Sequence, residues 1–331
     1  MGDRIAVRQR GDDRVDVTVG GEPFTSYLTD EAAPVLTKPV LVPLRTPNGT
    51  PITRGYPLSP RGGERVDHPH HIGLWFTYGD VNGHDFWNAS GPLDGDAGSA
   101  TRDYADQHPR IRHREIRDTE DGEGQGRLAV SAEWIESGGR TALLEETAYV
   151  FRASPDALTI DRETTLTARS DVSLGDDKEG LLGLRVRREL EHPSGEPVVL
   201  TDVTGQPAAK PSLDEGDVTG EYRSSEGERG TDVWGTRARW VALDGRIDEE
   251  DVTVAIFDHP DNVGHPTYWH ARGYGLFAAN PLGQAVFSDG ETHLGFSLES
   301  GESTTFRHRI SVFSGRPDSA SLEESYEQFV G

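Results

Sequence analysis

The chain has 331 residues, with 57 acidic against 33 basic side chains and a formal net charge of −24. Such a surface repels DNA, RNA and anionic lipid, so we expect neither a nucleic-acid nor a membrane partner. The sequence has no cysteine, which excludes disulfides, thiolate metal ligands and cysteine nucleophiles. It also lacks the run of roughly 18 apolar residues that a membrane helix needs and the apolar core of a signal peptide. We therefore expect a cytoplasmic protein.

The positive charge is carried almost entirely by arginine, since the lysines are Lys38, Lys178 and Lys210 alone. A chain rich in acid and poor in lysine suits a salt-rich cytoplasm, where molar salt screens charges within roughly 3 Å. The composition thus predicts a halophilic protein. A GC-rich genome, which enriches arginine, aspartate and glycine, is the alternative explanation.

Alternation of apolar and polar residues with a period of two dominates the chain. Val15, Val17 and Val19, for example, share one face of the first such segment. Turns separate the segments without helices between them, which favours packed antiparallel sheets. In chain order, the predicted strands are 14–19, 128–135, 142–151, 157–169, 181–190, 237–243, 252–257, 293–298 and 305–313.

The last segment, 319–329, is different because Leu322, Tyr326 and Phe329 form one stripe at helical spacing. A polar stretch at 205–230 reads as a surface excursion or lid, because strands resume on both sides of it. We therefore predict an all-β fold, a large antiparallel β-sandwich with a short C-terminal helix. Residues 1–331 are expected to form a single domain.

The densest chemical signal is the histidine segment, His68-Pro69-His70-His71. Three imidazoles within four residues suit proton transfer at neutral pH or metal ligation. If the segment is extended, His68 and His70 share one face and His71 takes the other. The alternative is that these histidines cap loops by hydrogen bonding. Two nearby aromatic residues could stack against a sugar ring, namely Trp75 and Trp87.

Two other segments gather ionisable groups. In Asp177-Lys178-Glu179, a lysine held by carboxylates can position a substrate oxygen or act as an acid; the alternative is a solvated turn. The segment 257–281 is expected to be a loop after a strand, where binding residues often lie, or else an aromatic core corner with satisfied histidines. Its candidate residues are His259, Asn262, Trp269, His270, Arg272 and Asn280.

Several motifs are absent from the sequence. It contains no GxGxxG opening a helix, no P-loop, no HExxH and no GxSxG. Nucleotide-dependent chemistry and a serine-hydrolase mechanism therefore have no support.

Four segments together resemble a bacterial and archaeal family labelled "methane oxygenase PmoA family", whose function is otherwise unknown. The matching residues run from His68 to Trp87, from Lys178 to Arg185, from Trp234 to Trp240 and from Trp269 to Pro281, while Ile72 departs from the arginine expected in many relatives. The label does not describe a function here, because the methane monooxygenase subunit of that name is an integral membrane protein. The resemblance implies instead a β-sandwich similar to the galactose mutarotase superfamily, a fold associated with sugar-binding clefts.

On this basis we hypothesise a carbohydrate-active enzyme that acts on a free or modified sugar and needs no cofactor. The resemblance implies a histidine acid paired with a carboxylate base, for which the candidates are His68 or His71 and Glu179. Sugar oxygens would be bound by His70, Lys178, Arg185, His259, Asn262, His270, Arg272 and Asn280, and sugar faces by Trp75, Trp87 and Trp269.

Two alternatives belong to other classes. One is a metal-dependent oxygenase or isomerase, with a divalent metal on His68, His70 or His71 together with His259 or His270 and a carboxylate. The other is a non-catalytic sugar-binding module. The sequence leaves the sugar, the reaction and the oligomeric state open.

Overall fold

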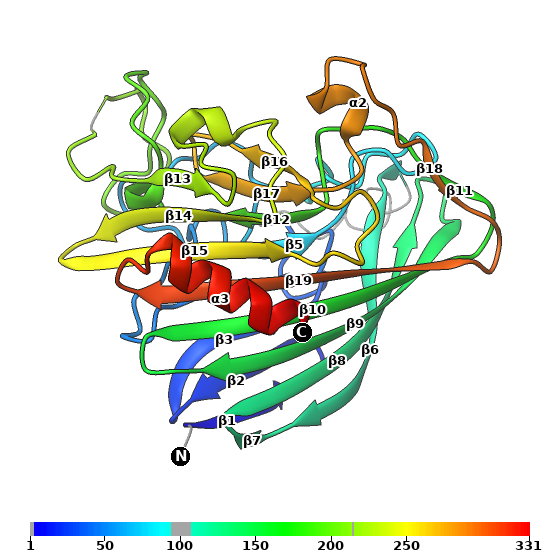
Figure 1. Ribbon diagram of the computed structural model, residues 1–331, viewed down its shortest axis with the longest axis horizontal. Coiled ribbons are helices and arrows are strands. Elements are labelled where there is room, and N and C mark those ends of the chain that lie inside the picture. The colour runs from blue at the N-terminus through cyan, green and yellow to red at the C-terminus, as the bar shows by residue number, and fades with distance from the viewer. Residues whose placement is uncertain (1–2, 94–106, 214) are drawn as a thin grey trace.

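The computed structural model describes residues 3–93, 107–213 and 215–331. Two large antiparallel sheets pack face to face, and apolar side chains fill the space between them (Figure 1). The predicted all-β antiparallel fold with a short C-terminal helix is confirmed. No helix of the described ranges is long and apolar enough to cross a membrane.

In residues 3–93, 107–213 and 215–331, the strands form three sheets. The nine-stranded sheet has the order β16 (Tyr268–Ala271), β17 (Leu276–Asn280), β12 (Leu182–Arg185), β5 (Leu74–Phe76), β4 (Val40–Leu41), β3 (Glu22–Leu28), β2 (Arg14–Val19), β1 (Arg4–Arg10) and β7 (Gly122–Glu123). The eight-stranded sheet has the order β13 (Glu221–Ser224), β14 (Trp240–Ile247), β15 (Glu250–Asp258), β19 (Ser303–Ser314), β10 (Ala157–Ala168), β9 (Thr141–Ala153), β8 (Gln125–Ile135) and β6 (Arg110–Glu120). A two-stranded sheet pairs β11 (Val172–Leu174) with β18 (Phe296–Leu298).

The period of two produces the core between the sheets. In β10, Leu158, Ile160 and Leu166 are buried in that core, whereas Thr159 and Thr165 on the other face are partly exposed. Each fully buried aliphatic side chain contributes roughly 1.5–3 kcal/mol relative to exposure. The core is therefore the main source of stability, and it fixes which face of each strand looks outward.

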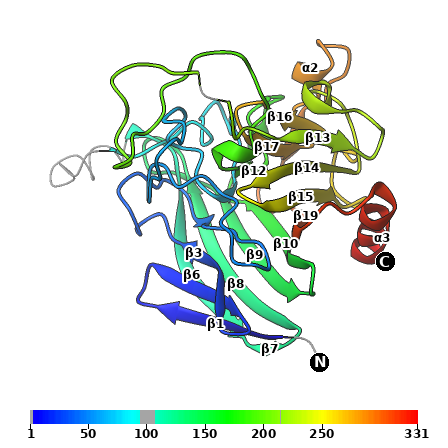
Figure 2. The same cartoon turned by 90° about the vertical axis from the view of Figure 1, so that its left-hand side faces the viewer.

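Helix α3 (Ser319–Val330) covers part of the outer face of the eight-stranded sheet (Figures 1 and 2). It begins where the Asp318 side chain accepts a hydrogen bond from the Ser321 backbone, which satisfies one free N–H of the first turn. Its stripe of Leu322 and Tyr326 packs on Trp240 and other apolar residues of the sheet.

Several boundaries differ from the sequence expectation. The region expected as a loop at 257–281 contains β16 and β17, and predicted strand 181–190 shortens to β12 followed by the 3₁₀ helix η1 (Arg188–Leu190). Strands this short and buried on both faces lack the alternation from which strands are predicted.

The polar stretch 205–230 runs through turns into β13 and ends at the 3₁₀ helix η2 (Gly230–Val233), with Asp214 outside the described residues. A one-turn helix α2 (Gln284–Phe287) follows β17. That the whole chain is one domain stays a prediction.

Candidate functional site

The pairing register of β5, β12, β17 and β16 aligns one residue of each strand in a row on the outer face of the nine-stranded sheet. Trp75 of β5 lies opposite Gly183 of β12, and Ala278 of β17 lies opposite both Gly183 and His270 of β16. The adjacent residue Trp269 points the other way, into the core between the sheets. Gly183 is required here, because a Cβ at that position would lie 2.5 Å from the Trp75 indole.

The histidine segment is a tight turn rather than an extended strand, because the His71 amide donates to the His68 carbonyl at 3.0 Å. His68 has a φ of 43°, in the left-handed region. The rings of His68 and His71 therefore stack in parallel, with centroids 4.8 Å apart, while His70 meets both edge-on. The expectation for an extended segment, that His68 and His70 share a face, does not hold for this turn.

A buried arginine that the sequence did not single out holds this turn. The Arg54 guanidinium donates to the carbonyls of Arg65, Asp67, His68 and His71 at 2.7–3.1 Å. It also reaches the Asp67 carboxylate at 3.1 Å. Burial, with the neighbouring Arg185 charge, lowers the pKa of Arg54 to about 9. Arg54 thus fixes the position of the histidines through their backbone.

Asp67 connects the turn to the sheet. Its Oδ1 accepts from Arg185 Nη2 at 2.6 Å, and His68 Nδ1 lies 3.4 Å from the same oxygen. Burial alone would raise the pKa of Asp67, but the His68 hydrogen bond and the charges of Arg185 and Arg54 outweigh it and hold the pKa well below its usual value. The carboxylate is therefore ionised and orients His68.

His71 is surrounded by donors. Trp87 Nε1 donates to its Nε2 at 3.2 Å, and the Arg185 guanidinium lies 3.3 Å from its Nδ1. Both neighbours can only donate, so an imidazolium would direct two N–H groups at donors. Burial, followed by the His70 and Arg185 charges, lowers the pKa of His71 well below its usual value. This environment suits a neutral acceptor better than a residue that exchanges protons with a ligand.

Glu179 and His270 meet on the same face from different parts of the chain. The Glu179 Oε1 pairs with Lys178, while its Oε2 lies 3.8 Å from His270 Nδ1. The other imidazole nitrogen of His270 accepts from Arg272 Nε at 3.1 Å. Burial, with the charges of Arg272 and Lys178, lowers the pKa of His270 to about 3. His270 is thus a neutral group beside a carboxylate.

Tyr274 packs against both the histidine turn and Arg185. Its ring stacks on His68 with centroids 4.9 Å apart, and the Arg185 guanidinium lies 4.9 Å from its centre. Burial raises the pKa of Tyr274 to about 12, partly offset by Arg185 and reinforced by Glu179. We call the resulting group the histidine site: it consists of His68, His70, His71, Glu179, Arg185, His270 and Tyr274.

The histidine site contains both accessible and buried groups. The His68 side chain is 40% exposed and the Lys178 side chain 42%, so a ligand can reach this end. Within the described part of the chain, three buried polar atoms here have no hydrogen-bond partner: His70 Nε2, Trp75 Nε1 and Arg185 Nε. Buried polar groups are normally paired, so their concentration on one face indicates a place where a ligand or bound water completes the network.

The tryptophans lie behind this surface. Trp75, Trp87 and Trp269 are at most 2% exposed. Trp75 stacks on His71, Trp87 donates to it, and Trp269 donates to the Ala238 carbonyl. None of the three has an exposed face for a sugar to stack on: Trp75 and Trp87 form the wall behind His71, whereas Trp269 lies in the core between the sheets. Tyr274 and His68 are the rings that a ligand can reach.

Three further candidates do not join the histidine site. Asn280 is fully buried, accepting from the amides of Leu282 and Gly283 and donating to the Asp177 carbonyl. His259 and Asn262 lie beyond β15, where Asn262 donates to Asp258 and His259 packs against Phe329. Their polar atoms are used by neighbouring parts of the chain, which sequence proximity to His270 could not indicate.

The histidines do not assemble into a set of metal ligands. Over the described residues, no group of three or more histidine, aspartate or glutamate side chains is arranged to hold a metal ion. The reason is visible at His71, both of whose nitrogens already face Trp87 and Arg185.

Lys38 is a second residue that composition alone could not place. It is buried, and its ammonium donates to the Trp87 carbonyl at 3.2 Å. Burial, opposed by Asp85, lowers the pKa of Lys38 to about 7, and its charge contributes to the low pKa of His70, about 2. Lys38 thus holds the backbone of Trp87, whose indole donates to His71.

Comparison with known families gives a match over most of the chain. Residues 14–327 match a family described as "Family of unknown function (DUF6807)". The chain belongs to this family. The description differs from the methane-oxygenase label that the motifs suggested. A search of curated proteins finds no match.

Solved structures with related folds are distant from this DUF6807 protein. An α-galactosidase, AgaA from Geobacillus stearothermophilus, is 10% identical over 89% of this chain and 40% of its own, with a TM-score of 0.41. A galactose mutarotase-like protein from Clostridium acetobutylicum is 9% identical over 94% and 98%, with a TM-score of 0.40. A putative aldose 1-epimerase from Escherichia coli K12 is 12% identical over 94% and 99%, with a TM-score of 0.32. The chain thus spans about two fifths of the length of the α-galactosidase.

Proposed function

We propose that this protein is a carbohydrate-active enzyme that transforms a free or modified sugar by acid–base chemistry at the histidine site. Two observations carry the proposal: the partly exposed His68 stacks on the ring of Tyr274, and the Glu179 carboxylate, whose charge helps to raise the pKa of Tyr274, lies 3.8 Å from His270 on the same face of the sheet. A proton donor and a proton acceptor on one accessible face are what ring opening, epimerisation, elimination and glycoside cleavage share.

The roles divide according to exposure. His68, oriented by Asp67, exchanges a proton with the sugar, and Glu179 exchanges the second. Lys178 and Arg272 bind sugar oxygens at the open end. His71 and Arg185, which are buried, keep His68 and Tyr274 in place rather than contact the reacting atoms.

The test is turnover on a panel of aldoses, ketoses, keto-sugars and simple glycosides, followed by proton NMR of substrate and product. We expect one member to be converted, and Glu179→Gln to slow that conversion about 100-fold or more, as loss of a general acid or base does. Glu146→Gln is the matched control, since Glu146 is an exposed carboxylate on the other sheet.

Two results would contradict the proposal. One is equal turnover in the wild type and Glu179→Gln. The other is a sugar that binds the protein, with no member of the panel converted by the wild type, which would make the protein a binding module.

A further inference from the structure

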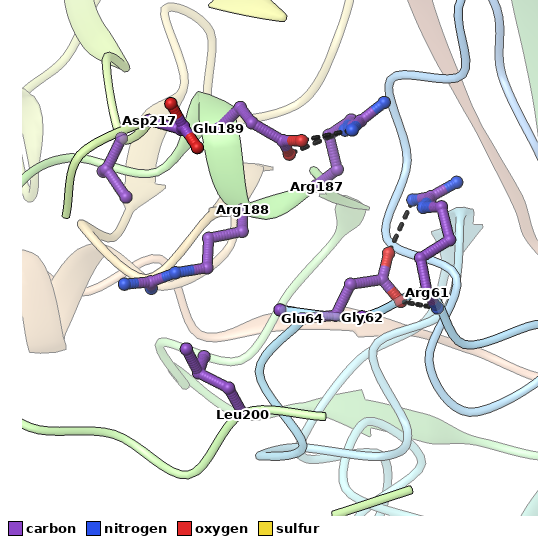
Figure 3. Close-up of a pocket in the computed structure, with 10 residues that line it drawn as sticks. Arg61, Gly62, Glu64, Arg187, Arg188, Glu189, Leu200 and Asp217 are labelled. Carbon is purple, nitrogen blue, oxygen red and sulfur yellow. Dashed lines mark hydrogen bonds and ion pairs between the residues drawn. The ribbon is translucent and has the colours of Figure 1, made fainter. Parts of the chain in front are cut away.

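A separate cavity opens beyond the end of β12 (Figure 3). Four parts of the chain line it: the loop 61–64, residues 187–189 at the start of η1, Leu200, and Asp217 with Val218 from the polar stretch 205–230. We call it the arginine pocket. Its volume of about 140 Å³ is well below the roughly 300–1,000 Å³ of sites for drug-sized ligands, so it admits one small molecule.

Each guanidinium at the arginine pocket already faces a carboxylate. Arg187 Nε donates to Glu189 at 2.7 Å, Arg61 donates to Glu64 at 2.6 Å, and Arg188 donates to the buried Glu191 at 3.1 Å. The Arg187 and Arg61 charges also help to lower the pKa of Glu189, against the effect of burial. Because the cations are balanced, an anionic ligand would have to displace an ion pair, and a neutral polar ligand fits better.

The lining supplies what a neutral sugar needs. A guanidinium has five N–H donors and a carboxylate about four acceptor sites, so the ion-paired groups keep capacity for sugar hydroxyls, and Leu200 and Val218 offer small apolar surfaces to C–H groups. The Asp217 carboxylate is exposed and has no ion-pair partner in the described ranges, so it is free to accept from a hydroxyl. Figure 3 shows Asp217 and Glu189 on one side of the hollow and Arg61 and Glu64 on the other.

The pocket wall is held in place before any ligand binds. Glu64 is buried, and its two oxygens accept from the amides of Gly55, Tyr56 and Arg61. This network fixes the loop that carries Gly62 and Gly63, and a preformed wall lowers the entropy cost of binding.

The arginine pocket and the histidine site are neighbours but distinct. Arg185 and Arg187 lie two residues apart, about 6.6 Å along an extended chain, on either side of the core residue Val186. Arg65 connects their surroundings, because it donates to Glu191 at 2.6 Å and lies 3.9 Å from Asp67. The arginine pocket shares no lining residue with the histidine site, so each can be tested by its own substitutions.

We propose that the arginine pocket is a second binding site, for a single neutral sugar unit. The long excursion 205–230 then has a role, because its Asp217 and Val218 close one side of the pocket. The proposal goes beyond the acid–base function and does not depend on Glu179.

The test uses methyl glucoside, methyl galactoside and methyl mannoside with the full chain, observed by saturation-transfer difference NMR. These glycosides cannot ring-open, and the resonances of the intact glycoside report binding separately from any cleavage. We expect a signal for at least one of them in the wild type and an undiminished signal in Glu179→Gln. Leu200→Trp, which fills the cavity, should reduce affinity at least 10-fold, and Asp217→Asn about 3-fold. Asp232→Asn, another exposed aspartate near the excursion, is the matched control and should change nothing.

Three results would overturn the proposal. The first is no signal from any glycoside in the wild type. The second is a signal that survives both Leu200→Trp and Asp217→Asn. The third is a signal lost in Glu179→Gln alone, which would place the sugar at the histidine site and leave the proposed function standing. Asp217 is exposed, so its substitution keeps the test valid if Leu200→Trp fails to fold.

Discussion

Two clusters of histidines lie on different sheets, and they differ in what their carboxylate contacts. In the histidine site, Glu179 lies beside Lys178 and 3.8 Å from His270, with exposed groups around it. In the second, which we call the Asp258 cluster, Asp258 accepts from Asn262, His265 and the Thr267 amide at 2.7–3.0 Å. His308 lies 3.6 Å from the same carboxylate and is buried.

A high density of histidines therefore does not by itself identify a ligand-binding site. Asp258 is fully buried, and its hydrogen-bonding capacity is used by its own chain. Glu179 and His68 retain access to a ligand. The same residue types thus form a closed hydrogen-bonded corner in one place and include partly exposed groups in the other.

The largest effect is expected for Arg54→Met. This change leaves four carbonyl groups without their buried donor and removes one of the two buried arginines that face Asp67, so it should lower the free energy of unfolding by about 3–5 kcal/mol. Urea unfolding measures it. Arg237→Met is the control: Arg237 also donates to backbone carbonyls but is exposed, so its loss should cost less than about 1 kcal/mol. Equal costs for the two variants would show that Arg54 does not hold the turn.

Asp258→Asn changes the carboxylate at the centre of the Asp258 cluster. An amide nitrogen in place of an oxygen would face a donor, so we expect a loss of about 1–3 kcal/mol in stability. The rate of sugar turnover should remain unchanged once the variant is folded. A fall in turnover comparable to that of Glu179→Gln would mean that the Asp258 cluster takes part in the function.

Acid should destabilise the protein through both clusters. Burial is the main reason that the pKa values of His70, His270 and His308 fall to about 2, 3 and 4. The unfolded chain binds protons below its histidine pKa of about 6.5, where the folded chain does not, so stability declines as the pH falls from about 6.5 towards 4. Each histidine contributes at most about 1.4 kcal/mol per pH unit.

Urea unfolding at pH 7, 6, 5 and 4.5 tests this dependence. His308→Gln should reduce the slope of the free energy of unfolding against pH by at most about 1.4 kcal/mol per pH unit. A wild-type free energy of unfolding that stays constant from pH 7 to 5 would contradict the role given to the buried histidines.

The smallest effect is expected from salt, on the order of 1 kcal/mol, because exposed charge pairs contribute little individually. With a net charge of −24, the protein should unfold more readily in dilute buffer than in 3 M KCl. Equal stability in both solutions would contradict the halophilic prediction and would leave the predictions for the histidine site and the Asp258 cluster unchanged.

The sequence predicted the long strands well and the site only in part. The predicted strand 14–19 coincides with β2, and 157–169 differs from β10 by one residue, because half-buried strands alternate visibly. The segments around His68, Glu179 and His270, which the sequence marks as rich in ionisable residues, lie on one face of the nine-stranded sheet, and their role in function stays a prediction. Arg54 escaped notice because its partners are backbone carbonyls, which leave no trace in side-chain patterns. The burial of Trp75 and Trp87 could not be foreseen either, since it depends on the loops that cover the outer face of the sheet.

We propose above all that the histidine site, and not the Asp258 cluster, binds a sugar. The most direct measurement is the imidazole NMR spectrum of the protein during titration with a broad panel of sugars, with resonances assigned from His68→Gln and His265→Gln. We predict that at least one sugar shifts the His68 signals while those of His265 and His308 stay in place. Signals of His68 that remain unchanged across the panel, or shifts confined to His265 and His308, would contradict the claim.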